Sequence, residues 1–127
     1  MTSVEIPFSI AAALPSLAVV DVTNEVAREV ARSEYGDGLA YVSSGQSSLV
    51  RLAERERGLF EDLECFLGRL VPKGAPDRSR ILGFLLGPRT EQIPFSGGEL
   101  CLGRYQRILI FSFDESCRSD WTLTLLG

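Results

Sequence analysis

Short apolar runs, each followed within a few residues by a turn-forming sequence, fill the C-terminal half of this chain. The turns read Gly-Pro, Ser-Gly-Gly and Glu-Ser-Cys, and the runs expected to form strands are residues 81–86, 90–95, 99–102, 107–113 and 121–126. Connections this short join antiparallel strands, because a crossover between parallel strands needs a dozen residues or more. The pattern therefore predicts a β-rich fold with mostly antiparallel sheets.

Three further strands are expected in the N-terminal half. From Val4 to Ile10, apolar side chains alternate with polar or small ones, which is typical of a half-buried strand. Pro7 has no amide hydrogen to donate, so this strand is expected at a sheet edge or at a bulge. Residues 17–22 and 39–44 are the other two candidates, and a short apolar piece, residues 49–52, follows them.

Two segments have the apolar spacing of helices. The first starts at Thr23 or Asn24, whose side-chain oxygen can accept a hydrogen bond from the first turn, and Gly36 and Gly38 are expected to end it in positive-φ conformations. The second ends before Pro72, and its apolar residues recur every three or four positions: Leu59, Phe60, Leu63, Phe66, Leu67 and Leu70.

Length and composition fit one domain, residues 1–127, of the α+β class, with sandwich-like antiparallel sheets and two helices. The apolar share of 45% and the charged share of 24% are ordinary for a soluble globular protein, and a net charge of −4 argues against nucleic-acid binding. No apolar run approaches the roughly 18–20 residues of a membrane span, and no signal peptide is visible. We therefore expect a cytoplasmic protein with neither nucleic acid nor membrane as a partner.

The chain contains no histidine, and its three cysteines are isolated from one another at positions 65, 101 and 117. Without imidazoles or a Cys-x-x-Cys pair, the chain lacks the ligands of a zinc site. Three isolated cysteines also do not form a disulfide framework. Carboxylates at the spacing of a calcium loop are also missing. We expect buried or bystander thiols, no bound metal and no cofactor.

Three stretches occur in the order and at the approximate spacing seen in the YjbQ-like family. They are residues 58–63 (Gly-Leu-Phe-Glu-Asp-Leu), residues 85–88 (Leu-Leu-Gly-Pro) and residues 102–108 (Leu-Gly-Arg-Tyr-Gln-Arg-Ile), the last leading into Asp114. The chain thus resembles this family, whose members are often described as secondary thiamine-phosphate synthases. The resemblance implies the YjbQ-like fold and a homotrimer.

The same resemblance indicates where the family's active-site residues would fall. A His-Thr-Thr-Ala segment aligns so that the histidine falls at Gly45 or Gln46 and the small polar residues at Ser47 and Ser48. The family's Asn-Glu pair falls on residues 53–54, where only the carboxylate of Glu54 is kept. Glu56 also fits a frequent family acid.

Further along, the family's histidines are replaced by arginines. The loop that carries a His-Asn or His-Asp pair is shortened to residues 72–79, and the histidine positions hold Arg78 and Arg80. The Gly-Thr-Trp-Gln segment becomes residues 103–106, which keep the glutamine, Gln106, and an aromatic ring. Arginine stays protonated, so it can neither bind a metal nor shuttle protons near neutral pH.

These departures favour a degenerate member that has lost metal-dependent catalysis. Its remnant catalytic candidates are Glu54, Glu56 and Gln106, and its ligand-binding candidates are Ser47, Ser48, Arg78, Arg80 and Gln106. Arg78 and Arg80 would lie on one face of a strand, where planar guanidinium donors could bind a phosphate-like small anion. The alternative, which the position at a loop-to-strand junction favours, is that both arginines are solvated, and Glu54 and Glu56 are more typical of a stretch that pairs with its neighbouring arginines.

Three functions stay open at this point. The chain could be a small-anion-binding or structural trimer of unknown role, a residual enzyme of thiamine-phosphate formation or related phosphoryl chemistry, or a trimeric interaction module. The missing histidines favour the first and third, so we lean against an enzyme. The retained Glu54 and Gln106 keep the second open.

Overall fold

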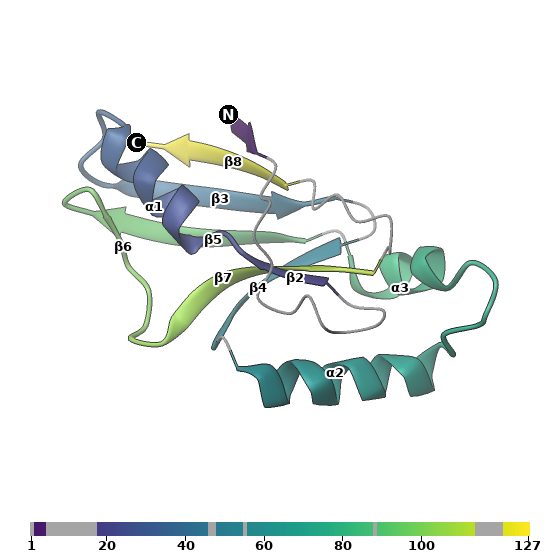
Figure 1. Cartoon of the computed structure of the whole chain (residues 1–127). Helices are drawn as coiled ribbons and strands as arrows, with labels where there is room; N and C mark the ends of the chain where they lie inside the picture. The colour runs from purple at the N-terminus through teal and green to yellow at the C-terminus, as the bar shows by residue number, and fades with distance from the viewer. Residues whose placement is uncertain (1, 5–17, 46–47, 55, 88, 114–120) are drawn as a thin grey trace.

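Among the residues that the structure describes, two antiparallel sheets face each other, one helix packs against the core between them, and two helices cover the outer face of the smaller sheet (Figure 1). The computed structural model describes residues 2–4, 18–45, 48–54, 56–87, 89–113 and 121–127. In this part of the chain, the five-stranded sheet has the order β1 (Thr2–Val4), β8 (Trp121–Leu126), β3 (Gly38–Ser44), β5 (Thr90–Ser96) and β6 (Glu99–Leu100). The three-stranded sheet has the order β2 (Ala18–Asp21), β7 (Gln106–Ser112) and β4 (Ser48–Glu54). The helices are α1 (Thr23–Arg32), α2 (Arg57–Leu70) and α3 (Arg78–Leu86). The predicted α+β class is confirmed.

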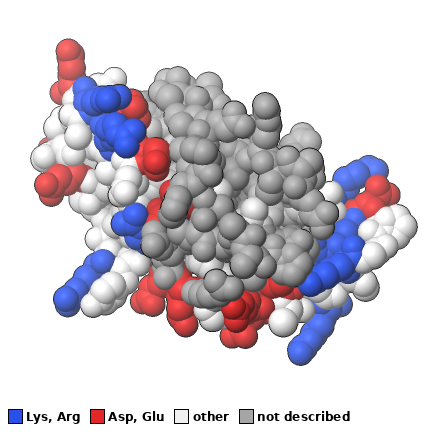
Figure 2. Space-filling model, viewed as in Figure 1, with Lys and Arg blue, Asp and Glu red and all other residues white. Residues whose placement is uncertain are grey.

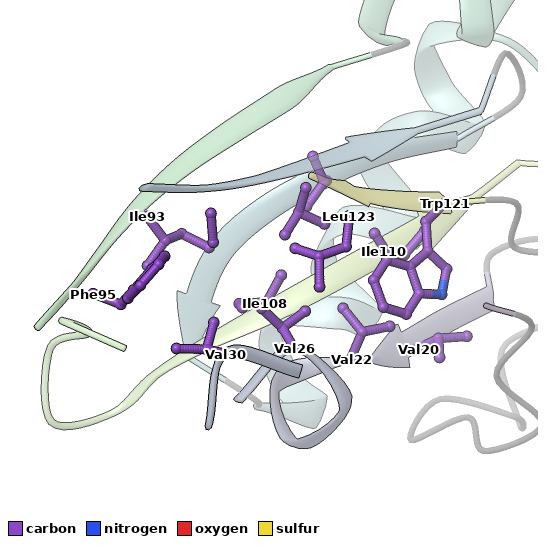
Figure 3. Close-up of a cluster of buried hydrophobic side chains, with 13 residues drawn as sticks. Val20, Val22, Val26, Val30, Ile93, Phe95, Ile108, Ile110, Trp121 and Leu123 are labelled. Carbon is purple, nitrogen blue, oxygen red and sulfur yellow. The ribbon is translucent and has the colours of Figure 1, made fainter. Parts of the chain in front are cut away.

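The main core lies between the two sheets. Alternate residues of β3, β5 and β8 point inward, as the period of two requires, and meet Ile108 and Ile110 of β7. Val26 and Val30 of α1, one turn apart, complete this cluster, and Figure 3 shows side chains from α1 and both sheets converging there. Trp121 is 1% exposed within it.

A second apolar cluster lies on the other face of the three-stranded sheet, beneath α2 and α3. Leu109 and Phe111 of β7 point into it, and Phe60 of α2 meets the Phe111 ring edge-on, with centroids 5.8 Å apart. Strand β7 is therefore buried on both faces. The cover that an apolar strand of this kind requires comes from within the chain.

Residues 81–86, expected as a strand, form most of helix α3 instead. A short apolar run does not distinguish a strand from a buried helix, and here Arg78 and Leu82, one turn apart, both face the interior. Leu82 belongs to the cluster beneath the helices. The described residues thus contain three helices where two were predicted.

The predicted end of the first helix was also wrong. α1 ends at Arg32, where the backbone amide and hydroxyl of Ser33 bond to the Val30 carbonyl, so Gly36 and Gly38 are not needed to end it. Neither glycine has a positive φ. Gly38 opens β3, where a Cβ atom would collide with the Leu126 carbonyl oxygen. Strand β1 lies at an edge of the five-stranded sheet, whereas residues 5–10, which include Pro7 and most of the predicted first strand, lie outside the described part.

Candidate functional site

Glu54 and Gln106 lie opposite each other at one end of the three-stranded sheet. They are direct partners in the pairing of β4 with β7, so their side chains share a face. Leu52 and Ile108, the next partners on that face, belong to the core between the sheets. Glu54 and Gln106 themselves are exposed. The carboxylate and the amide therefore stand at the edge of the core rather than inside it.

The Gln106 side chain holds the turn that precedes β7. Its Oε1 accepts a 2.7 Å hydrogen bond from the Gly103 amide, while the Gln106 amide donates to the Gly103 carbonyl at 3.1 Å. Tyr105 projects from this turn, 62% exposed, with the Arg104 guanidinium 5.2 Å from its ring centroid. The retained glutamine thus has a structural role that would exist without any ligand.

Next to Gln106, a buried polar cluster joins β7 to the start of α1. Arg107 Nε donates a 2.7 Å hydrogen bond to Asp21 Oδ2, and the amide and hydroxyl of Thr23 donate to Asp21 Oδ1 at 3.0 and 2.6 Å. The Thr23 hydroxyl oxygen in turn accepts from the Ile108 amide at 2.8 Å. Asp21, rather than the predicted Thr23 or Asn24, supplies the side-chain acceptor for the first turn of α1.

The Asp21 carboxylate is 3% exposed, yet it stays ionised. Burial alone would raise its pKa, but the hydrogen bonds from Arg107 and Thr23, together with the Arg107 charge, outweigh that effect and hold the pKa below its ordinary value. Neither Asp21 nor Arg107 was predicted as a functional residue. An Asp two residues before a helix-starting Thr is the signal that could have indicated the cluster.

Ser48 lies at the opposite end of β4 from Glu54. Its hydroxyl donates to the Gly45 carbonyl at 3.2 Å, and its own carbonyl accepts from the Ser44 hydroxyl at 3.1 Å. A Cβ atom on Gly87 would collide with the Ser48 carbonyl oxygen, so the end of α3 packs directly against this strand end. These bonds give Ser48 the role of a turn residue. Ser47 lies outside the described residues.

Arg78 and Arg80 do not share a face. They lie on α3, where a spacing of two residues turns the side chains by about 200°. Arg78 is 9% exposed, and its Nε donates a 2.9 Å bond to the Val71 carbonyl at the end of α2. The Arg80 side chain is 82% exposed and pairs with Asp77 at 3.6 Å. The expectation that both lie on one strand face was wrong, because residues 78–86 are helical.

The structure brings Glu54 and Gln106 together but places Arg80 far from them. Glu54 comes just before α2, whereas Arg78 bonds to Val71 just after it. Helix α2 has 14 residues and therefore spans about 20 Å. Figure 1 shows α3 at the opposite end of α2 from the β4–α2 connection. Glu54, Arg80 and Gln106 do not line one pocket.

The remaining candidates are exposed. Glu56 precedes α2, and its backbone carbonyl accepts from the Phe60 amide at 3.2 Å. Cys65 and Cys101 are exposed free thiols, whereas Cys117 lies outside the described part. Among the described residues, no three His, Cys, Asp or Glu side chains gather as a metal ion would require. In the same part of the chain, no helix is long and apolar enough to cross a membrane.

One further ion pair was not foreseen from the sequence. Glu64 lies on the buried side of α2, 5% exposed, and its Oε1 is 3.3 Å from Nζ of Lys73, the chain's single lysine. The pair connects α2 to the loop that leads to α3. Together with the Arg78–Val71 bond, it fixes the junction of the two helices.

The matches with known proteins agree on one family. Residues 12–127 match the family model described as UPF0047 protein YjbQ-like. A curated UPF0047 protein of Archaeoglobus fulgidus is 37% identical over 105 residues, which cover 76% of this chain and 81% of that protein.

Solved structures with the same fold come from bacteria and archaea. A YjbQ/UPF0047 family protein of Clostridium acetobutylicum superposes with a TM-score of 0.82 at 21% identity, covering 99% of this chain and 100% of that one. A hypothetical protein of Aeropyrum pernix K1 gives a TM-score of 0.79 at 26% identity, covering 100% and 99% of the two chains.

Proposed function

The chain belongs to the YjbQ-like UPF0047 family, and we propose that it is a member without metal-dependent catalysis that serves as a structural, homotrimeric protein. The family resemblance implies that histidines bind a metal ion in the active site of other members. This chain has no histidine. The proposal therefore concerns what the replacing residues do.

The observation that carries the proposal is the position of Arg78. The residue at a histidine position of the family is buried, and its guanidinium donates to the Val71 carbonyl. A charged donor turned to the end of a helix stabilises the helix junction. It cannot transfer a proton near neutral pH.

The other retained positions support the same proposal. Gln106 Oε1 is bonded to the Gly103 amide, and the Ser48 hydroxyl is bonded to the Gly45 carbonyl. A serine nucleophile also needs a neighbouring base, and the family's histidine is not available to supply one. Both of these polar side chains have a bonding partner within the fold.

The homotrimer follows from the family resemblance, and the outer face of the five-stranded sheet is a suitable surface for it. Leu39 and Leu126 are direct partners on that face, and Leu126 is 53% exposed. Tyr41, two residues along β3, is half-buried on the same face. A sheet face of this mixed character packs against a partner or against water.

Small-anion binding at Arg80 is the second candidate. The observation that favours it is the open position of this side chain at the first turn of α3, where helix amides also attract anions. The carboxylate of Asp77, with which Arg80 forms an ion pair, weakens the attraction. We expect Arg80, and not Arg78, to contact an anion bound at this site.

The proposal is tested by assay and by metal analysis. We expect no thiamine-phosphate formation by the purified protein and far less than one zinc per chain after dialysis. Turnover that Glu54→Gln abolishes would instead establish the residual enzyme.

Calorimetry with phosphate and thiamine phosphate separates the second candidate. Binding that Arg80→Ala removes and Arg28→Ala keeps would support an anion site, because Arg28 is an exposed arginine on a different helix. Equal heats for wild type, Arg80→Ala and Arg28→Ala would show that Arg80 is a solvated surface residue without a role in binding.

A further inference from the structure

Helix α2 carries two apolar stripes, and the fold uses one of them. The buried stripe consists of Phe60, Leu67 and the following Val71, all in the cluster beneath the helices. The second stripe contains Leu59, Phe66 and Leu70, which are 45%, 59% and 47% exposed. A helix that merely covers a sheet needs only one stripe, with polar residues elsewhere.

The second stripe has the spacing of a coiled-coil seam. Leu59, Leu63, Phe66 and Leu70 are separated by four, three and four residues, which is the repeat that keeps a seam facing another helix. Leu63, in the middle, is half-buried against the inner cluster. The outer seam thus consists of four apolar residues on one side of α2, and Leu63 joins it to the inner cluster.

The charges beside this outer seam are self-complementary. Asp62 and Arg69, both exposed, precede Leu63 and Leu70 by one residue and so lie on the same flank. They are seven residues apart and opposite in sign. If two copies of α2 run antiparallel, Asp62 of each lies beside Arg69 of the other when Leu63 faces Phe66 and Leu59 faces Leu70. The apolar and charge patterns therefore select the same register.

The charges along the helix agree with this arrangement. In the view of Figure 2, acidic side chains gather below the first half of α2 and basic side chains lie beyond its end. An antiparallel partner brings its basic end to the acidic half, whereas a parallel partner would place like charges together. Like charges in register oppose association.

We propose that α2 pairs with α2 of a second copy, antiparallel and across a twofold axis, through the outer seam. Such an interface is the same patch on both copies, as twofold symmetry requires. It is independent of the threefold contact proposed above. Together the two contacts would produce a hexamer, and the seam alone would produce a dimer.

Multi-angle light scattering of the intact protein distinguishes these cases. Masses of two or six times the 13.9 kDa chain support the pairing, and six supports the trimer as well. Three chains would leave the trimer and overturn the pairing. A monomer would overturn both.

Substitutions then assign the interface. Phe66→Ser should weaken the association roughly thirtyfold or more, because an aromatic side chain at the centre of a small interface is a hot spot. Cys65→Ser, a neighbouring exposed change outside the seam, should leave the mass unchanged. Equal masses for wild type and Phe66→Ser at the dissociation midpoint would contradict the proposal.

Charge exchange tests the antiparallel register itself. Asp62→Arg and Arg69→Asp should each weaken association on the order of tenfold, since each creates two like-charge pairs. An equimolar mixture of the two single variants, and the double variant alone, should recover the wild-type affinity. Failure of both to recover would exclude this register. Circular dichroism of each variant shows that α2 is still folded.

Discussion

Helices α1 and α2 both cover apolar residues of the sheets, but they differ in what they leave outside. α1 has one apolar stripe, Val26 and Val30, and both residues are fully buried. At its start the Thr23 amide donates to the Asp21 carboxylate, and at its end the Ser33 hydroxyl donates to the Val30 carbonyl. α2 also has a buried stripe, but its second apolar stripe faces outward. The apolar content of a helix does not show whether the helix only completes a core or also presents an apolar surface to a partner. The number of apolar stripes on the helix does show this.

The two phenylalanines of α2 give the sharpest form of this comparison. Phe60→Ala should destabilise the monomer by about 3–5 kcal/mol, because it opens a cavity against Phe111. Phe66→Ala should change monomer stability by less than about 0.5 kcal/mol, since its ring is mostly in solvent. Urea unfolding at concentrations where the protein is monomeric measures both. Similar losses for the two variants would show that α2 does not have an inner and an outer stripe.

The polar anchoring of α1 should cost less to break than the Phe60 contact. Asp21→Asn removes the charge that Arg107 pairs with, and we expect a loss of about 2 kcal/mol at pH 7. Glu29→Gln, on the same helix, removes only the solvated 3.5 Å pair with Arg32 and should cost less than about 0.5 kcal/mol. A loss for Asp21→Asn no larger than for Glu29→Gln would mean that the cluster does not anchor α1.

The same pair gives a pH dependence of known sign. The pKa of Asp21 is lower in the folded protein than in the unfolded chain, so its contribution is complete above a pH of about 4. It is lost as the pH falls through the folded-state pKa, because the carboxylate must then be protonated. The stability difference between wild type and Asp21→Asn should therefore shrink below about pH 4. A difference that persists unchanged in acid would point to packing rather than charge.

The smallest effect is expected at the junction of α2 and α3. Arg78→Met keeps the aliphatic bulk but loses the bond to Val71, which should cost about 1–2 kcal/mol. Arg80→Met should cost less than about 0.5 kcal/mol, because its side chain is solvated. Thermal unfolding of both variants measures the contrast. If Arg80→Met were the more destabilising, the assignment of the two arginines would be reversed.

Much of the fold could be predicted from local patterns. Short apolar runs bounded by turn residues predicted the strands β3, β5, β7 and β8, and the predicted stop at Pro72 agrees with α2 ending at Leu70. The run from Ile81 to Leu86 was wrongly assigned to a strand, because an apolar residue at nearly every position fits the period of a strand and that of a helix. Because Arg78 and Arg80 belong to a helix rather than a strand, their side chains point in different directions.

The candidate site was less predictable, because it depends on pairing between distant segments. That Glu54 faces Gln106 depends on the register of β4 with β7, which local sequence does not determine. The Asp21–Arg107 pair joins residues 86 positions apart. The apolar spacing of α2 is visible in the sequence, but only the structure shows which of these residues are buried and which form the outer seam.

The central position of strand β7 affects how this protein unfolds. Its two edges are bonded to β2 and β4, and its two faces belong to the two apolar clusters. No fluctuation can expose its backbone amides without disrupting both clusters. The amides of Ile108 to Phe111 should therefore exchange with solvent deuterium only through global unfolding, and their rates should report the free energy of the whole domain. The sandwich and its helical cover would behave as a single cooperative unit.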